Sequence, residues 1–304
     1  MHASMPTREP ALSSAARRAR GLSLVALTIA SILCGTAAQA LPVPPTGNWD
    51  PAVPGTTTPT TWSSTEPTGF VWNVVDGSLS PVAGQGAITS TWSFDGNNDR
   101  MRAASFQGLY GGGTQQPTSF ELWIRPAGLA GGGQVIFETG GRTSGLSITL
   151  DDDQLLFRVK QGSSVVSLSA TLTATDIADF VQVVGVLDAS APPLPGDPNS
   201  WLYLNGGLVD QDTDQGVRDW SGNNGSGIAR ANGQIGGNTG DLSGFGYYAG
   251  ELAIMRFYEN QALDAAQVLQ NFDAVMGNVP EPSTGLLLGL GLGMLARLAR
   301  SPRP

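Results

Sequence analysis

Oxygen-bearing side chains gather at three places in this chain, and each place could supply the ligands that calcium prefers. In 210–216, aspartates alternate with other residues before a glycine, as at the start of a calcium-binding loop. Residues 95–99 combine two aspartates with two asparagines, and 151–153 is a run of three aspartates. Because aspartate and asparagine also favour tight turns, each segment could instead be a solvated turn, which we favour for 151–153. A structural Ca²⁺ is therefore a hypothesis for the other two segments, with the candidate ligands Asp95, Asp99, Asp210, Asp212 and Asp214.

Groups for acid–base or nucleophilic catalysis are scarce. The only histidine is His2 and the only cysteine is Cys34, and both lie in an N-terminal region with the features of a removable signal. Its removal would leave no imidazole base, thiol nucleophile or disulfide. Glu121, Glu138 and Glu251 each lack a second acid two or four residues further on, whereas glycoside hydrolysis uses paired carboxylates. We therefore expect a protein that is not an enzyme, with a glycan-active enzyme as the alternative.

Aromatic residues in glycine- and asparagine-rich segments form a candidate sugar-binding surface. They occur in 219–227 and 236–250, where the glycines would let a polymer approach the backbone. Aromatic faces stack on the apolar side of a sugar, and asparagine amides pair with hydroxyls. Loop aromatics can instead cap a core, and Trp92 and Trp123, in alternating segments, are expected inside it. The candidate ligand-binding residues are Trp220, Asn223, Asn224, Asn238, Tyr247 and Tyr248.

The elements that would position these residues are short β-strands. Apolar residues alternate with polar ones in 88–94 and 119–125, and further short apolar runs follow between glycine, asparagine and aspartate turn signals. At least ten such segments predict an all-β, two-sheet sandwich. One helix is predicted over 264–276, because Asp264 and Gln267 can form a capping box before an apolar stripe. The stripe consists of Val268, Leu269, Phe272 and Val275.

Residues 1–40 have the order of a secretory signal peptide. Arginines precede the apolar run 21–33, and Ala38 and Ala40 form a small-x-small cleavage site. The run is short for an uncleaved membrane anchor, which is the alternative. An arginine pair leaves the twin-arginine export route open beside the Sec route. Residues 41–67, rich in proline and threonine, are expected to be a spacer that leads into a first edge strand.

The C-terminus carries the most specific motif of the chain, Pro280, Glu281 and Pro282, before a leucine- and glycine-rich run and an arginine-rich tail. Over 279–304 this order resembles the PEP-CTERM sorting signal of Gram-negative bacteria that make exopolysaccharide. The resemblance implies export across the inner membrane, processing by an exosortase-type protease, and delivery to the cell surface or extracellular matrix. The short hydrophobic helix would associate with the inner membrane transiently, because it falls short of a ~30 Å hydrocarbon core.

Composition narrows the range of partners. The 304 residues include 41 glycines and 20 prolines, which indicates many turns, and the formal net charge is −9. Proteins that bind nucleic acid need a basic face, so nucleic acid is not expected as a partner. The two ends hold more basic than acidic residues, so the part between them is more acidic than the whole chain. Such a surface suits neutral sugars or divalent cations.

Four motifs occur in the order found in laminin-G-like domains, at 94–99, 120–126, 201–206 and 250–258. Over 68–276 the chain thus resembles a laminin-G-like, concanavalin A-like jelly roll with antiparallel sheets and one short C-terminal helix. The closing strand has Ala253 and Ile254 where that family often has Asp-Glu, which puts a cation site on those acids in doubt. The resemblance implies an adhesive or structural role in which the jelly roll binds glycan or exopolysaccharide. A ligand-free structural matrix protein is a further alternative.

Overall fold

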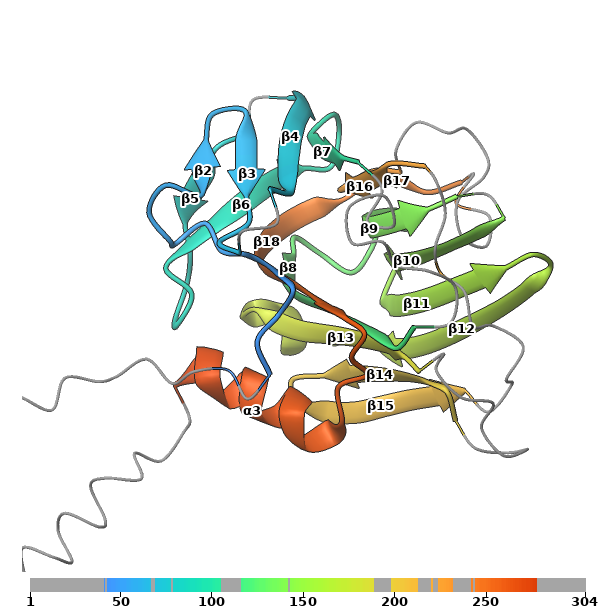
Figure 1. Cartoon of the computed structure of the whole chain (residues 1–304). Coiled ribbons are helices and arrows are strands. Elements are labelled where there is room, and N and C mark those ends of the chain that lie inside the picture. Colours follow the sequence, from blue (N-terminus) through green and yellow to red (C-terminus); the bar gives the residue numbers. More distant parts are fainter. Residues whose placement is uncertain are drawn as a thin grey trace, which may run out of the picture. The chain divides into compact units, whose positions relative to one another are not determined.

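The computed structural model describes residues 41, 43–66, 69–77, 79–104, 116–141, 143–188, 198–212, 220, 224–231, 242 and 244–277. These residues form two β-sheets, here sheet A and sheet B, and a C-terminal helix, α3 (Ala265–Met276) (Figure 1). Strand pairing is antiparallel except for one short parallel pair. The predicted all-β, two-sheet jelly-roll sandwich with one short C-terminal helix is confirmed.

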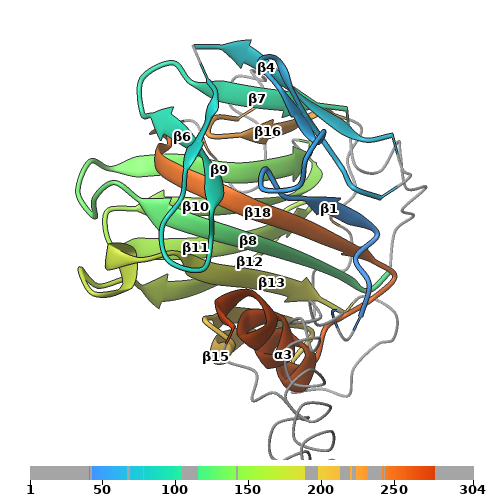
Figure 2. The same cartoon turned by 90° about the vertical axis from the view of Figure 1, so that its left-hand side faces the viewer.

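Sheet A contains the strands that later define the candidate site. They are β1 (Gly47–Trp49), β5 (Pro81–Ala83), β6 (Ser90–Asp95), β8 (Thr118–Pro126), β13 (Val181–Leu187), β14 (Ser200–Leu204), β15 (Gly207–Asp212) and β18 (Ala249–Glu259). Their order is β15, β14, β13, β8, β18, β6 and β5, and β1 also pairs with β18. In Figure 2, β18 runs across the sheet beside β8 and β1. The last strand of the chain therefore lies in the interior of sheet A.

Sheet B forms the other layer. Its strands are β2 (Thr57–Thr58), β3 (Thr61–Ser63), β4 (Val71–Asp76), β7 (Arg100–Ala103), β9 (Gly133–Gly140), β10 (Ser144–Asp151), β11 (Gln154–Gln161), β12 (Ser164–Thr171), β16 (Ser226–Ile228) and β17 (Gly246–Tyr247). They follow the order β12, β11, β10, β9, β16, β7, β4, β3 and β2, and β17 pairs with β9 in parallel. Strands β15 and β12 thus form the edges of sheet A and sheet B, and they contact each other.

Alternation along the strands builds the core between the sheets. In β8, Phe120, Leu122 and Ile124 point into the sandwich, while the residues between them face the outside of sheet A. The sheets approach so closely that a Cβ on Gly185 of β13 would come within 2.4 Å of the Phe157 ring in β11. A glycine is therefore required at this contact between the two layers.

The region expected to be a spacer belongs to the sandwich, so that prediction was wrong. Residues 47–49 form β1 and pair with the centre of β18, and β2 and β3 extend sheet B. Trp49 and Trp62 are fully buried in the main core. Proline and threonine interrupt and shorten these strands, but the two indoles supply enough apolar surface to hold the segment in place.

Helix α3 begins and ends at the residues that its sequence predicts. Asp264 Oδ1 accepts the Gln267 amide N–H at 2.9 Å, and Gln267 Oε1 accepts the Asp264 N–H at 2.9 Å, which completes the capping box. Gly277 ends the helix in the left-handed conformation, with a φ of 67°. Val268 is buried as expected, whereas Leu269 is 47% exposed and lies beside the β14–β15 turn at Gly206.

Among the described residues, no helix is both long enough and apolar enough to cross a membrane. The predicted apolar runs at 21–33 and 285–295, the cleavage site at Ala38 and Ala40, and the motif Pro280, Glu281 and Pro282 all lie outside the described residues.

Candidate ligand-binding site

The acidic turn at 95–99 is satisfied by its own backbone. Asp95 Oδ1 accepts the amide N–H groups of Asn97 at 2.8 Å and Asn98 at 3.1 Å. These hydrogen bonds lower the pKa of Asp95 below its ordinary value. Asp99 Oδ2 accepts the Asp95 N–H at 2.9 Å. Both candidate calcium ligands therefore shape the turn between β6 and β7.

The second acidic segment is not a loop in the part that the structure describes. Asp210 and Asp212 lie in the extended strand β15, and Asp214 is outside the described residues. Asp210 Oδ2 accepts the amide N–H of Ser169, on the edge of β12, at 2.8 Å. Nowhere in the described ranges do three or more acidic, histidine or cysteine side chains come together as a metal site would need. Calcium binding at these residues stays a prediction.

The hydrogen bond between Ser169 and Asp210 allows an edge-capping role of Asp210 to be distinguished from calcium binding. If its carboxylate caps the β12 edge, Asp210→Ala should cost about 1 kcal/mol, which lowers Tm by roughly 2–4 °C, equally in EDTA and in millimolar calcium. Uncapping the edge should also promote self-association, visible by light scattering after size-exclusion chromatography. Asp210→Asn keeps an acceptor and serves as the control. A wild-type Tm that rises with calcium, and does not rise in Asp210→Ala, would contradict the edge-capping role.

Two of the predicted sugar-stacking aromatics are core residues, which corrects that expectation. Trp220 is 3% exposed; its Nε1 donates to Thr118 Oγ1 at 3.0 Å, and its ring packs edge-on against Phe120 and Phe257. Tyr248 is fully buried, and its Oη donates to the Glu251 carbonyl oxygen at 3.2 Å. Neither ring has a face free for a sugar. Their glycine-rich surroundings indicated loops, but not the direction in which the rings point.

The structure describes two of the four other predicted ligand residues, Tyr247 and Asn224. Tyr247 is half-buried, and the Arg230 guanidinium lies 4.5 Å from the centre of its ring. Asn224 lies beside Gly141. Asn223 and Asn238 lie outside the described residues, so the structure does not bring the predicted set together.

Two buried phenols predict how stability depends on alkaline pH. Burial, followed by the neighbouring carboxylates Glu251 and Glu121, raises the pKa of Tyr248 and Tyr258 well above 10.0. Above about pH 10 the unfolded chain releases these protons while the folded chain keeps them, so stability is lost as pH rises. The free energy of unfolding should fall by up to about 2.7 kcal/mol per pH unit in urea titrations. Tyr248→Phe should lower this slope by about 1.4 kcal/mol per pH unit, and an unchanged slope would contradict the assignment.

Glu121 is isolated in the sequence but is the centre of a buried polar cluster in the structure. It points away from the core, from the outer face of β8 toward α3. Its carboxylate accepts five hydrogen bonds of 2.8–3.0 Å, from Trp123 Nε1, Gln182 Nε2, Arg256 Nη1, Tyr258 Oη and Asn271 Nδ2. Burial alone would lower the pKa of Arg256, but Glu121, Tyr258 and Asp50 together outweigh burial and raise that pKa. Because the carboxylate is fully enclosed, the cluster has a structural role.

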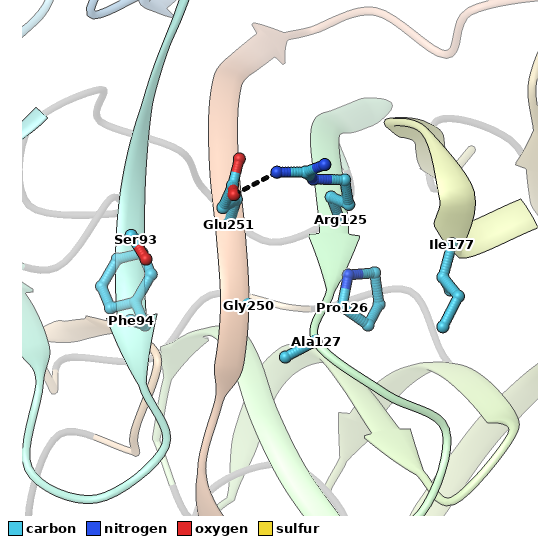
Figure 3. Close-up of a pocket in the computed structure, with 8 residues that line it drawn as sticks. All are labelled: Ser93, Phe94, Arg125, Pro126, Ala127, Ile177, Gly250 and Glu251. Carbon is cyan, nitrogen blue, oxygen red and sulfur yellow. Dashed lines mark hydrogen bonds and ion pairs between the residues drawn. The ribbon is translucent and has the colours of Figure 1, made fainter. Parts of the chain in front are cut away.

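An open pocket of about 310 Å³ lies farther along the same face of sheet A. Its lining comes from β6, from the adjoining ends of β8 and β18, and from the short 3₁₀ helix η1 (Asp176–Ala178) (Figure 3). The lining residues are Ser93, Phe94, Arg125, Pro126, Ala127, Ile177, Gly250 and Glu251. Strand register places Glu251 between Ser93 on one side and Arg125 on the other.

Charged groups in the pocket are held in place by their neighbours. Arg125 Nη2 donates to Glu251 Oε1, and Arg125 Nη1 donates to Gln85 Oε1. The Arg125 guanidinium also lies 5.5 Å from the centre of the Phe180 ring. The other carboxylate oxygen, Glu251 Oε2, is buried and has no hydrogen-bond partner among the described residues. The Glu251 carboxylate, whose side chain is 17% exposed, thus lies at the pocket as an acceptor beside the N–H groups of a fixed guanidinium.

Gly250 forms part of the pocket lining because a side chain would not fit there. Its φ is 150°, and an added Cβ would come within 2.5 Å of Tyr248 Oη and 2.6 Å of the Arg125 carbonyl oxygen. Only one carboxylate lines the pocket, whereas hydrolysis of a glycosidic bond uses two. The arrangement can bind a hydroxylated ligand, and sequence analysis missed it because Glu251 and Arg125 meet only through strand register.

Comparison with protein-family models identifies the fold. Residues 95–269 match the model of the concanavalin A-like lectin/glucanases superfamily, which spans more than half of the chain. The chain belongs to this superfamily. Residues 278–303 match the PEP-CTERM protein-sorting motif, so the predicted C-terminal signal is confirmed as well. No curated protein sequence matches the chain significantly.

At Ala253 and Ile254, the closing strand β18 lacks the Asp-Glu pair that laminin-G-like domains often have. A bulge in β18 between Leu252 and Met255 places both residues in an apolar cluster with Trp123, Phe180 and Ile88. Phe272 of α3 stacks on Trp123, with ring centres 5.7 Å apart. Ala253 and Ile254 therefore help to hold helix α3 on the sheet through apolar contacts. Acidic side chains at these two positions would be buried in this apolar cluster.

Three solved structures with a similar fold are described as binding or receptor-binding domains. The binding domain of Paraclostridial mosquitocidal protein 1 has a TM-score of 0.56 and 14% identity, and the match covers 76% of this chain and 52% of that one. The receptor-binding domain of botulinum neurotoxin C/D mosaic serotype has a TM-score of 0.54, 10% identity, and coverages of 75% and 51%. The binding domain of botulinum neurotoxin DC in complex with SialylT has a TM-score of 0.51, 13% identity, and coverages of 76% and 51%. The chain therefore spans about half the length of the solved structures it matches.

Proposed function

We propose that this protein is an exported surface protein whose jelly roll binds glycan without catalysing a reaction, and that the Arg125–Glu251 pocket holds the ligand. The observation that supports the proposal most directly is the partly exposed Glu251 carboxylate beside the guanidinium of Arg125, in an open pocket on a lectin-like fold. Paired donors and acceptors of this kind are what sugar hydroxyls need, since each hydroxyl both donates and accepts.

The sorting motif supports the cellular part of the proposal. A PEP-CTERM signal directs export and surface sorting, so an exosortase-type protease is the expected processing partner. The apolar run at 285–295 would associate with the inner membrane only until cleavage. The mature domain would then act in the exopolysaccharide layer or at the surface of a Gram-negative cell.

One preparation tests both parts of the proposal. Protein from the native host should have an intact mass that lacks residues 1–40 and the arginine-rich tail. The same protein should be retarded in native gels that contain the host exopolysaccharide. Glu251→Gln should lose the retardation, while Glu66→Gln, a matched change outside the pocket, should keep it. If several preparations of the host exopolysaccharide all fail to retard the mature protein, glycan binding is refuted.

A further inference from the structure

The pocket contains a row of three polar side chains on neighbouring strands. Ser93 of β6, Glu251 of β18 and Arg125 of β8 are cross-strand partners, so their side chains share the outer face of sheet A. Adjacent strands lie about 4.8 Å apart, so the three groups span two strand spacings, or about 10 Å. In Figure 3, Glu251 and Arg125 point toward each other, and Ser93 projects from the strand beside them.

Charge balance in this row selects against anions. Glu251 already neutralises Arg125, and no other charged side chain of the described residues lines the pocket. An anionic group at Arg125 would lie beside the Glu251 carboxylate, and the two like charges would repel. It would also bring no proton to that carboxylate, whose side chain is 17% exposed. A hydroxyl of a neutral ligand can both donate to the carboxylate and accept from Arg125.

Apolar groups complete the pocket. Among the apolar lining residues, Ile177 is partly buried and would contact the C–H face of a ring. Phe94 and Pro126 are buried, and they alternate with Ser93 and Arg125 along their strands, so their side chains point toward the core. A glycine is required at 250 because a Cβ would collide with Tyr248 Oη and with the Arg125 carbonyl oxygen. The ring of Phe180 supports the guanidinium from one side, which fixes the direction of its remaining N–H groups.

We infer that the pocket selects a neutral sugar unit, which donates a hydroxyl proton to the Glu251 carboxylate and accepts from Arg125, and that it rejects uronic-acid polymers. This inference rests on the proposed glycan-binding function and specifies its ligand class. It assigns Glu251 as the residue that determines specificity, because its charge cancels the attraction of Arg125 for anions.

Affinity electrophoresis in EDTA with defined polymers tests the inference. The probes are soluble neutral glucan, mannan and galactan, together with the polyuronate alginate. Wild-type protein should be retarded by at least one neutral polymer and not by alginate. Glu251→Gln should weaken binding to the neutral polymer by about tenfold or more and should gain retardation by alginate, because Arg125 is no longer neutralised. Ser93→Ala, at an exposed site that should not affect folding, should weaken neutral binding several-fold.

The possible results distinguish failure of the neutral-ligand inference from failure of the proposed glycan-binding function. Retardation by alginate alone would overturn the neutral-ligand inference and leave glycan binding intact. No retardation by any probe or by the host polysaccharide would overturn the proposed function itself. If Glu251→Gln and Ser93→Ala, shown to be folded by circular dichroism, both bind the neutral polymer as well as wild type, the pocket is not the site. The control Glu66→Gln should match wild type on every polymer.

Discussion

Replacing Glu121 by alanine is expected to lower the free energy of unfolding by about 3–5 kcal/mol, which corresponds to a Tm decrease of roughly 6–20 °C. The carboxylate is fully buried and accepts hydrogen bonds from strands β8, β13 and β18 and from helix α3. Its removal leaves the Arg256 charge inside the protein without a counter-ion, at a side-chain exposure of 8%. Urea unfolding followed by circular dichroism measures the change.

A double variant distinguishes the buried charge from simple loss of volume. Glu121→Leu combined with Arg256→Met removes both charges, and it should be more stable than Glu121→Ala alone, since no uncompensated charge remains. Glu66→Ala, a half-buried glutamate outside the cluster, should change stability by no more than about 0.5 kcal/mol. If the double variant is less stable than Glu121→Ala, the ion pair does not have the role assigned to it.

Trp220→Ala is expected to be nearly as damaging, at about 3–5 kcal/mol, because the indole fills the core against Phe120 and Phe257. The change also leaves Thr118 Oγ1 without the Nε1 donor. Thermal unfolding should show the loss, and the fraction that remains folded at low temperature should bind glycan as the wild type does.

Tyr247→Ala provides the comparison for an aromatic residue that is not fully buried. Its contact with Arg230 is of a kind that contributes about 0.5–1 kcal/mol, so its stability should change little. Selective loss of glycan binding in Trp220→Ala, with stability unchanged, would restore the ligand-stacking role that the sequence suggested and contradict the core assignment.

Local sequence patterns predicted the elements of this fold well. Period-two alternation in 119–125 identified β8, and Asp264 with Gln267 identified the start of α3, because both depend on residues close together in the chain. The Pro/Thr-rich composition of 41–67 led to the wrong prediction of a spacer. Three short strands in this region are held by Trp49 and Trp62 through contacts with distant strands.

The sites could not be predicted in the same way. Glu121 meets Arg256 and Asn271 across 135 and 150 residues, and Glu251 meets Arg125 across 126. Each meeting depends on strand register, and a shift of one residue would move these side chains to the opposite face. No local pattern encodes that register, so only the assembled sheet shows which acids are enclosed and which face an open pocket.

The pairing of β1 with β18 has a consequence for the timing of folding during export. Gly47 lies opposite Phe257 and Trp49 opposite Met255, so β1, the first strand that the structure describes, cannot pair until β18, the last one described, has been delivered. A chain that crosses a membrane with its N-terminus leading would therefore arrive with sheet A incomplete, and pairing over such a separation is slow. A C-terminal segment that keeps the arriving chain at the membrane would hold β18 near the waiting first strand. The sorting tail would then give the sandwich time to close before the protein is released.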